Sequence, residues 1–224
     1  QPEDTVFTKQ RHTDIVRRVG RENRGEGLLR EQTEVCDAQI TDEPGVALVA
    51  FTADCTPILL FDPVRKAIAA IHAGWRGTAL GIAAKTVEAM TRAYGCRPQN
   101  IRAAIGPCIG QCCFETDEDV PQAMRSALGS EAEACIERRG KKFHVDNKAL
   151  NRIWLTRAGV RCIDISADCT MCQPERFWSH RVTGGNRSHH EKSNMSSAGG
   201  STADRTPVRL LRQEADHELG EGPL

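Results

Sequence analysis

The sequence predicts an α/β protein of the layered α+β kind, a single domain in which helices flank a mixed central sheet. Three observations support this fold class. Short apolar runs bounded by Pro or Gly are typical of buried strands. Apolar residues at helical spacing between those runs indicate amphipathic helices that cover the sheet. The chain has 224 residues, which suits one domain with a tail, and its apolar residues concentrate between positions 46 and 172.

The first part of the predicted core consists mainly of strands. We expect strands at 14–16, 46–52, 58–61 and 67–72. Pro44-Gly45 and Asp62-Pro63 supply the turns. Residues 20–34 are charged and contain glycines, which favours a surface loop, and residues 36–41 lead from that loop to the first turn.

After Gly77 the apolar spacing changes to that of a helix. We expect one amphipathic helix over 78–93, with Thr78 capping its start and Gly95 ending it. The remaining predicted elements are a strand at 101–105, a short helix opening at Asp117 or Asp119, a strand at 143–145, a helix capped by Asp146, and a strand at 160–165.

Charge and hydropathy exclude several classes of partner. The formal net charge is zero, which argues against a general nucleic-acid or anionic-membrane binder. No apolar run approaches the 18 residues typical of a transmembrane helix. Residues 1–10 are polar and do not form a signal peptide. We therefore expect neither nucleic acid nor membrane as a partner.

Ten cysteines raise the question of the redox compartment. A secreted disulfide framework is one interpretation, but such proteins are usually shorter than about 100 residues and rich in loops. Several cysteines here lie inside apolar runs or beside glycines. Reduced thiols in a cytoplasmic protein fit this pattern better.

The composition changes near the C-terminus. Beyond about residue 186 the chain is rich in Ser, Gly, Asn, Arg and Glu and contains few apolar residues. Such a segment buries too little apolar surface to offset its ordering entropy. We expect a domain over 5–187 followed by a poorly packed tail at 188–224.

Two metal-capable side chains follow or end apolar runs. Cys55 comes after the run at 46–51, and His72 comes after the run at 67–71. If these runs form adjacent strands, a thiolate and an imidazole reach the same edge of the sheet. Zinc and copper favour that mixture of ligands. A buried small cysteine and a satisfied core histidine are the alternative interpretation.

Four ordered blocks of sequence resemble the laccase-domain family of polyphenol-oxidase-like proteins, which is associated with purine nucleoside phosphorylase activity. The similarity extends over roughly residues 5–187, and the family has strand-forming sequence upstream, so we expect the N-terminal part of the family domain to be missing. The blocks are 52–60 (TADCTPILL), 69–77 (AAIHAGWRG), 106–115 (GPCIGQCCFE), and 169–172 (CTMC) with 176–181 (RFWSHR).

The resemblance implies a metal held by three residues of this chain, His12, Cys55 and His72. Three protein ligands leave a fourth position for water or substrate, as catalytic zinc requires. The implied cofactor is zinc, with copper as a second option. His12 lies between Arg11 and Thr13, whereas the family usually has an apolar residue before this histidine and Gly after it, so a surface histidine is the alternative.

Four further residues are candidates for the reaction. Asp54 can orient a metal ligand, act as an acid or base, or cap backbone amides in a turn. Arg76 stands between glycines just before a predicted helix and suits an anion such as phosphate, with a structural ion pair as the alternative. The Trp75 side chain either packs in the core or offers its flat ring to a purine base. Arg181, in the last block, is a candidate for substrate binding.

The remaining cysteines give no clear metal pattern. Cys108, Cys112 and Cys113 have the wrong spacing for a zinc knuckle and lack the signature of nucleotide deaminases. Cys169 and Cys172 are spaced as a redox pair or as half of a zinc site. No second pair with zinc-knuckle spacing stands elsewhere, so the spacing does not predict a second metal site.

The resemblance implies a metal-dependent enzyme that phosphorolyses adenosine, inosine or methylthioadenosine and also deaminates adenosine. Its partners would be a purine nucleoside and phosphate. A copper-dependent polyphenol oxidase is one alternative, although such oxidases need clustered histidines and only seven are present. A truncated, non-catalytic member of the family is the other.

Overall fold

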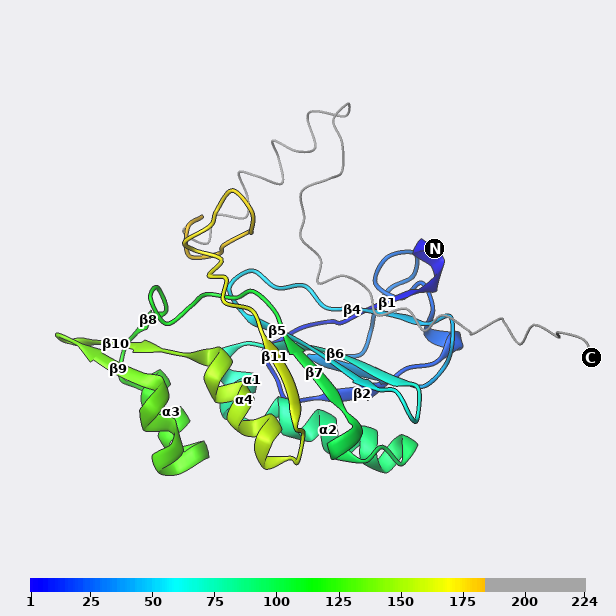
Figure 1. The fold of residues 1–224 in the computed structure, drawn as a ribbon. Helices are drawn as coiled ribbons and strands as arrows, with labels where there is room; N and C mark the ends of the chain where they lie inside the picture. Colours follow the sequence, from blue (N-terminus) through cyan, green and yellow to red (C-terminus); the bar gives the residue numbers. More distant parts are fainter. Residues whose placement is uncertain (184–224) are drawn as a thin grey trace, which may run out of the picture.

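A mixed six-stranded sheet organises residues 1–183, the part of the chain that the computed structural model describes (Figure 1). Its strand order is β11-β7-β5-β6-β3-β2, which confirms the predicted mixed sheet. The predicted tail at 188–224 lies outside the described residues. The strands of this sheet are β2 (Val16–Arg18), β3 (Ala38–Thr41), β5 (Thr56–Asp62), β6 (Ala67–Ala73), β7 (Arg102–Ile105) and β11 (Cys162–Ile165).

The centre of the sheet is the antiparallel pair β5–β6. Their register runs from Thr56 opposite Ala73 to Asp62 opposite Ala67. β7 adds to β5 and β3 adds to β6, both antiparallel, and the outer strands β11 and β2 join in parallel. All seven residues of β6 are buried, which explains its continuous apolar sequence.

Three helices, α1, α2 and α4, lie on one face of the central sheet in Figure 1, and a fourth, α3, packs beside α1. The main core lies between this face and α2 and α4, and it includes Ile71, Met90 and Leu155. The 3-10 turns are η1 (Pro2–Asp4), η2 (Arg21–Asn23), η3 (Pro98–Asn100) and η4 (Gly129–Cys135). The helices are α1 (Trp75–Ala79), α2 (Ile82–Tyr94), α3 (Asp119–Leu128) and α4 (Asn147–Arg157).

The single helix predicted over 78–93 is in fact two helices. Gly81 has a φ of 77°, a left-handed conformation that interrupts the helix between α1 and α2. Thr78 does not cap a helix start, because α1 already begins at Trp75 after Gly74. The Thr78 hydroxyl instead accepts a hydrogen bond from the Asn151 side chain. Gly95 ends α2 as predicted, with a φ of 65°.

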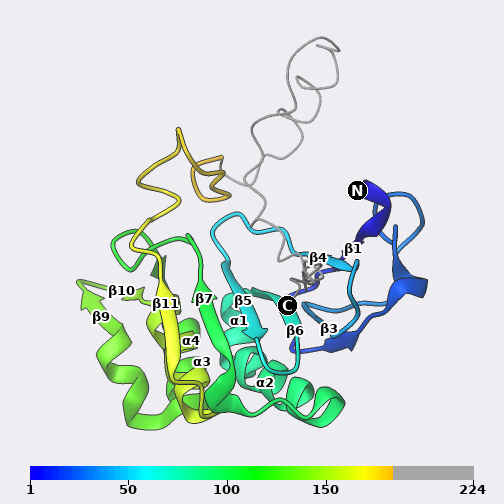
Figure 2. The same cartoon turned by 45° about the vertical axis from the view of Figure 1, so that its right-hand side comes forward.

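Two smaller sheets complete the architecture (Figure 2). β1 and β4 pair in parallel and pack with β6 residues such as Ile68 in a second core. β8, β10 and β9 form an antiparallel sheet next to α3. The strands are β1 (Thr5–Phe7), β4 (Ala47–Val49), β8 (Glu115–Thr116), β9 (Ile136–Arg139) and β10 (Lys142–Val145).

Sequence reasoning missed four strands, β1, β3, β8 and β9. β3 is wholly buried although it contains Gln39 and Thr41, so its burial does not follow hydropathy. The Gln39 amide nitrogen donates to the Phe7 carbonyl oxygen, which pairs the donor of this polar side chain inside the core. Asp146 caps α4 as predicted, because its carboxylate accepts from the backbone N–H of Ala149.

The expectations about the cysteines and about membrane-spanning helices can be compared with the structure. All ten cysteines lie within residues 1–183, and no disulfide joins any of them, as expected for reduced thiols. Among the described residues, none of the helices has both the length and the apolar character that a membrane crossing requires.

Candidate active site and metal centre

Cys55 and His72 meet at one end of the central strand pair. Cys55 immediately precedes β5, and His72 is the second-last residue of the antiparallel strand β6. The register pairs Pro57 with His72, so both side chains reach the same edge of the sheet. This edge was predicted, but the strand that delivers Cys55 was not. The run at 46–52 gives β4, which pairs with β1, and Cys55 instead lies directly before β5.

His12 completes a group of three candidate ligands. The ligand atoms of His12, Cys55 and His72 all lie within 4.8 Å of one another, and we call this group the histidine–cysteine centre. The Cys55 Sγ is 3.7 Å from the His12 Nε2. The two imidazole rings meet edge to face, with 4.9 Å between centroids and an interplanar angle of 75°. The structure therefore brings these three residues together, and their binding of a metal stays a prediction.

Asp37 holds both histidines in place. Its carboxylate accepts a hydrogen bond from the His72 Nδ1 at 2.8 Å. The same carboxylate accepts backbone N–H bonds from Arg11, His12 and Thr13 at 2.8–3.1 Å. These bonds fix the loop in which His12 has a φ of 59°, a left-handed conformation that is costly for this residue type.

The Asp37–His72 pair is buried. Asp37 is 0% exposed and His72 is 4% exposed. Burial acts to raise the pKa of the Asp37 carboxyl, but hydrogen bonds from His72 and Thr13 hold it well below its ordinary value. With Nδ1 bound to this carboxylate, the His72 Nε2 is the nitrogen that remains for a metal. Sequence reasoning missed Asp37, whose only signal was an acid within a mostly apolar segment.

The centre fits a tetrahedral metal ion. Bonds of about 2.0–2.3 Å to nitrogen and sulfur place neighbouring ligand atoms about 3.5 Å apart, close to the 3.7 Å between Cys55 and His12. Two imidazoles and one thiolate are donors that zinc and copper accept. Gly74 is required beside them, because a Cβ there would lie 2.6 Å from the His12 Cδ2 and 3.3 Å from the Cys55 Sγ.

Asn147 braces the strand ends beneath the centre. Its side-chain amide donates to the Thr56 hydroxyl at 2.9 Å and to the Ala73 carbonyl oxygen at 3.1 Å. Thr56 follows Cys55 and Ala73 follows His72, so this buried amide fixes the spacing of the two ligand-bearing strands. Apart from its place at the start of a predicted helix, Asn147 carries no sequence signal for this role.

Asp54 joins the start of β5 to the C-terminal part of the described chain. One carboxylate oxygen accepts from the Thr170 hydroxyl at 2.6 Å. The other accepts from the Ser179 hydroxyl at 3.1 Å and from the Arg181 N–H at 2.7 Å. Asp54 has a φ of 84°, so its backbone is strained where it precedes Cys55. The carboxylate is thus engaged in organising two loops.

Arg76 and Trp75 form a stacked pair at the start of α1. The Arg76 guanidinium carbon lies 4.2 Å from the centroid of the Trp75 ring, which is close enough for a cation–π contact. Arg76 is exposed, and within residues 1–183 it forms no ion pair with a carboxylate. Trp75 is half-buried against the core that contains α3. The Arg181 side chain donates two hydrogen bonds to the Glu115 carbonyl oxygen, each at 3.1 Å.

The fold and the centre together define a mixed-sheet α+β protein with a group of two histidines and one cysteine that could hold a metal ion. The chain belongs to the multi-copper polyphenol oxidoreductase laccase family, whose model matches residues 1–190. The expected family is therefore confirmed, and the fold class with it.

Named relatives and solved structures agree with this family. The chain is 34% identical over 180 residues to the purine nucleoside phosphorylase YlmD of Bacillus subtilis, a match that covers 79% of this chain and 65% of the relative. It is 35% identical to adenosine deaminase RL5 from an unknown prokaryotic organism, over 81% of this chain and 71% of the relative. The crystal structure of the hypothetical protein YfiH from Bacillus licheniformis has 36% identity and a TM-score of 0.80, covering 83% of this chain and 71% of that one.

Proposed function

We propose that this chain is a metal-dependent purine nucleoside enzyme that phosphorolyses adenosine, inosine or methylthioadenosine and deaminates adenosine. The observation that carries the proposal is the convergence of His12, Cys55 and His72 within 4.8 Å, which is the donor set for one metal with a position left for water or substrate. The relatives that are named purine nucleoside phosphorylase and adenosine deaminase support the substrate class.

The histidine–cysteine centre would hold zinc, with copper as the other option. When bound, the metal supplies a Lewis acid that makes water a better nucleophile at neutral pH, as deamination requires. The protein holds the His72 ring through Asp37 and the His12 loop through the same carboxylate. Ordering both histidines before the substrate arrives lowers the cost of reaching the reactive geometry.

We propose that Arg76 binds the phosphate that attacks the anomeric carbon of the ribose during phosphorolysis. Its planar fork of N–H groups suits phosphate, and no carboxylate among residues 1–183 competes for it. The Trp75 ring beneath the guanidinium offers a flat aromatic surface that suits the purine base. Arg181 would bind substrate near the loop that Asp54 anchors.

For Asp54 we propose a positioning role next to the metal. Three hydrogen bonds from Thr170, Ser179 and Arg181 occupy its carboxylate, which favours this role over direct proton transfer. Its backbone carbonyl oxygen also accepts from the Ile109 N–H at 3.0 Å. Asp54, the residue before Cys55, is thus joined to the loop that contains Ile109 and to the segment that contains Thr170 and Arg181.

The decisive experiment compares metal content and two activities in Cys55→Ala. We expect the variant to lose metal from the histidine–cysteine centre and to lose both phosphorolysis and deamination by more than about 100-fold, because even changes behind a ligand cost about 10–100-fold. Turnover of inosine with phosphate is read as free base, and turnover of adenosine is read as inosine. Full activity in Cys55→Ala would reject the metal mechanism.

A second set of variants tests the phosphate site. Arg76→Ala should lower phosphorolysis by about 10–100-fold and change deamination much less, since loss of a charge-assisted hydrogen bond costs about 1.5–3 kcal/mol. Arg76→Lys should recover only part of the activity. Arg92→Ala, which removes an exposed arginine of α2, is the matched control. Equal loss of both activities in Arg76→Ala, with metal and fold retained, would exclude a phosphate-specific role.

The same preparations test the oxidase alternative. The protein is purified without a polyhistidine tag and without added metal. It is then assayed for bound copper and zinc and for oxidation of a phenol. We expect zinc and no phenol oxidation. Stoichiometric copper together with phenol turnover that Cys55→Ala abolishes would replace the nucleoside proposal by the oxidase one.

A further inference from the structure

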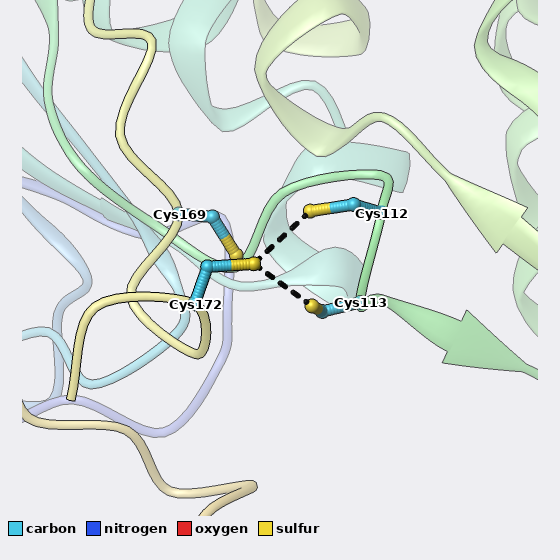
Figure 3. Close-up of side chains that lie close together, drawn as sticks. All are labelled: Cys112, Cys113, Cys169 and Cys172. Atoms are coloured by element: carbon cyan, nitrogen blue, oxygen red, sulfur yellow. Dashed lines mark hydrogen bonds between the residues drawn. The ribbon is translucent and has the colours of Figure 1, made fainter.

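Four cysteines outside the histidine–cysteine centre lie together in the structure (Figure 3). Cys112 and Cys113 are in the loop between β7 and β8, and Cys169 and Cys172 are in the segment after β11. Their sulfur atoms all lie within 4.8 Å of one another, and we call them the four-cysteine cluster. Figure 3 shows side chains from the two segments turned toward one another.

The spacing of the sulfur atoms fits a shared metal ion. The Cys172 Sγ is 3.7 Å from that of Cys112 and 3.4 Å from that of Cys113. These distances are much longer than the roughly 2.05 Å of a disulfide bond. They are close to the separation of about 3.8 Å between ligands of a tetrahedral zinc whose bonds to sulfur are about 2.3 Å.

We propose that Cys112, Cys113, Cys169 and Cys172 bind a structural zinc ion, distinct from the metal of the histidine–cysteine centre. Four sulfur ligands in tetrahedral geometry are typical of zinc or of iron–sulfur sites. An iron–sulfur cluster spreads its cysteines around several metal atoms, whereas these sulfurs are close enough to surround one ion. Four protein ligands close the coordination sphere, which is the mark of a structural site.

The backbone around the cluster already supports thiolates. The Gly110 N–H donates to the Cys169 Sγ at 3.2 Å, and such bonds stabilise and orient a metal ligand. A Cβ at Gly110 would lie 3.2 Å from both the Cys112 Sγ and the Cys169 Cβ, so a larger residue would crowd the site. The Thr170 N–H donates to the Cys108 carbonyl oxygen at 3.0 Å, which fixes the two segments in register.

The sheet explains why spacing alone did not reveal this cluster. The partner of the Cys-x-x-Cys pair is the adjacent pair Cys112-Cys113, which lies far upstream in the sequence. Cys113 and Cys172 are separated by 59 positions. Parallel pairing of β7 with β11 brings the segments that follow these strands to the same edge of the sheet. The absence of a second zinc-knuckle pair was therefore a poor reason to expect no second site.

Zinc at this position would tie the last part of the described chain to the rest. The stretch from 166 to 183 contains no helix or strand of its own, and backbone bonds such as Thr170 N–H to the Cys108 carbonyl oxygen hold it together with side-chain links. The cluster is one such link, and the hydrogen bonds from Thr170 and Ser179 to Asp54 are another. The cluster thus anchors the loop that contacts the residue before Cys55.

Metal counting tests the proposal. Wild-type protein, purified with reductant and without added metal, should contain two zinc ions per chain by elemental mass spectrometry. Cys172→Ser and Cys55→Ala should each retain one, and the double variant should retain none. Cys162→Ser, which changes an exposed cysteine of β11 outside both groups, should retain two. A single zinc that persists in Cys172→Ser and disappears in Cys55→Ala would overturn the proposal, as would iron or copper in the cluster.

Thiol labelling of the wild-type protein provides a readout that does not require a variant to fold. We expect the alkylating reagent to spare the four cysteines in native protein, although Cys112 and Cys172 are exposed, and to modify them after a chelator removes the zinc. Cys162 should react in both states. Rapid labelling of Cys112 and Cys172 without chelator, or a disulfide within the cluster under reducing conditions, would overturn the proposal. Because these cysteines are separate from Cys55, failure here would leave the proposed enzyme function standing.

Discussion

The histidine–cysteine centre and the four-cysteine cluster both contain cysteine thiols, but they differ in how completely they would surround a metal ion. The first has three candidate ligands from three separate segments, two of them imidazoles. The second has four thiols from two segments. Three ligands leave room for a reactant, whereas four saturate a tetrahedral ion. The number and type of ligands therefore separate a site suited to catalysis from one suited to holding loops together.

The two groups also differ in what supports them. A buried carboxylate, Asp37, orients the ligands of the histidine–cysteine centre. A backbone N–H from Gly110 supports the four-cysteine cluster. A charged group behind an imidazole strengthens its binding to metal, whereas a thiolate, already anionic, needs only neutral donors. Substitutions at Asp37, Gly74 and Asp54 should therefore change the histidine–cysteine centre, the four-cysteine cluster or both to different extents.

The largest effect is expected from Asp37→Asn. This change removes the carboxylate that binds His72 and the His12 loop while keeping its size, so the metal affinity of the histidine–cysteine centre should fall about 10–100-fold. Competition with a chromophoric chelator measures this affinity. Asp62→Asn, at the opposite end of β5, is the control and should leave it unchanged. Zinc loss from the four-cysteine cluster in Asp37→Asn would show that the two groups are not independent.

Gly74→Ala should have a smaller effect on the same centre. The added Cβ would overlap the His12 ring at 2.6 Å, but His12 is exposed and can shift, so we expect metal affinity to fall about tenfold, equivalent to about 1.4 kcal/mol. Gly45→Ala, where a Cβ would meet nothing within 4 Å, strains a backbone with positive φ and should not alter metal binding. Unchanged affinity in Gly74→Ala would mean that His12 is not a ligand.

The smallest effect on metal binding should come from Asp54→Asn. Asp54 precedes Cys55 in the chain, and its carboxylate accepts from Thr170, the residue after Cys169. Asn tolerates the positive φ at this position, but it replaces one acceptor oxygen with an amide donor that faces Thr170 or Ser179. We expect the free energy of unfolding to fall by about 1–2 kcal/mol. Urea denaturation measures this change. A loss of activity without any loss of stability would indicate a direct chemical role for Asp54.

Much of the central fold could be predicted from the sequence because its strands are continuous apolar runs. β5, β6 and β7 each coincide with a predicted strand, and the position of Cys55 and His72 at one sheet edge follows from the β5–β6 pairing. Cys55 and His72 could be recognised because they follow apolar runs, whereas His12 was expected only from the resemblance to the family. Where burial follows hydropathy, the sequence is a sufficient guide.

The remaining features depend on contacts between distant segments. Asp37 and Gln39 are buried polar residues whose partners lie on other segments, so hydropathy does not reveal them. The helix break at Gly81 requires a left-handed backbone that spacing of apolar residues cannot report. The four-cysteine cluster depends on the pairing of β7 with β11. The sequence around one cysteine pair therefore does not indicate that the other pair lies next to it.

The hydrogen bond between Asp54 and Thr170 has a consequence for the order of folding. It joins residues separated by 116 positions, and the Asp54–Arg181 bond spans 127. Contacts between such distant segments carry a large loop-closure cost and form after local structure. During synthesis, β5 and β6 can pair long before residues 169–181 leave the ribosome. We therefore expect the surroundings of Cys55 to mature last, so that a nascent chain pairs its central strands β5 and β6 well before this region is complete.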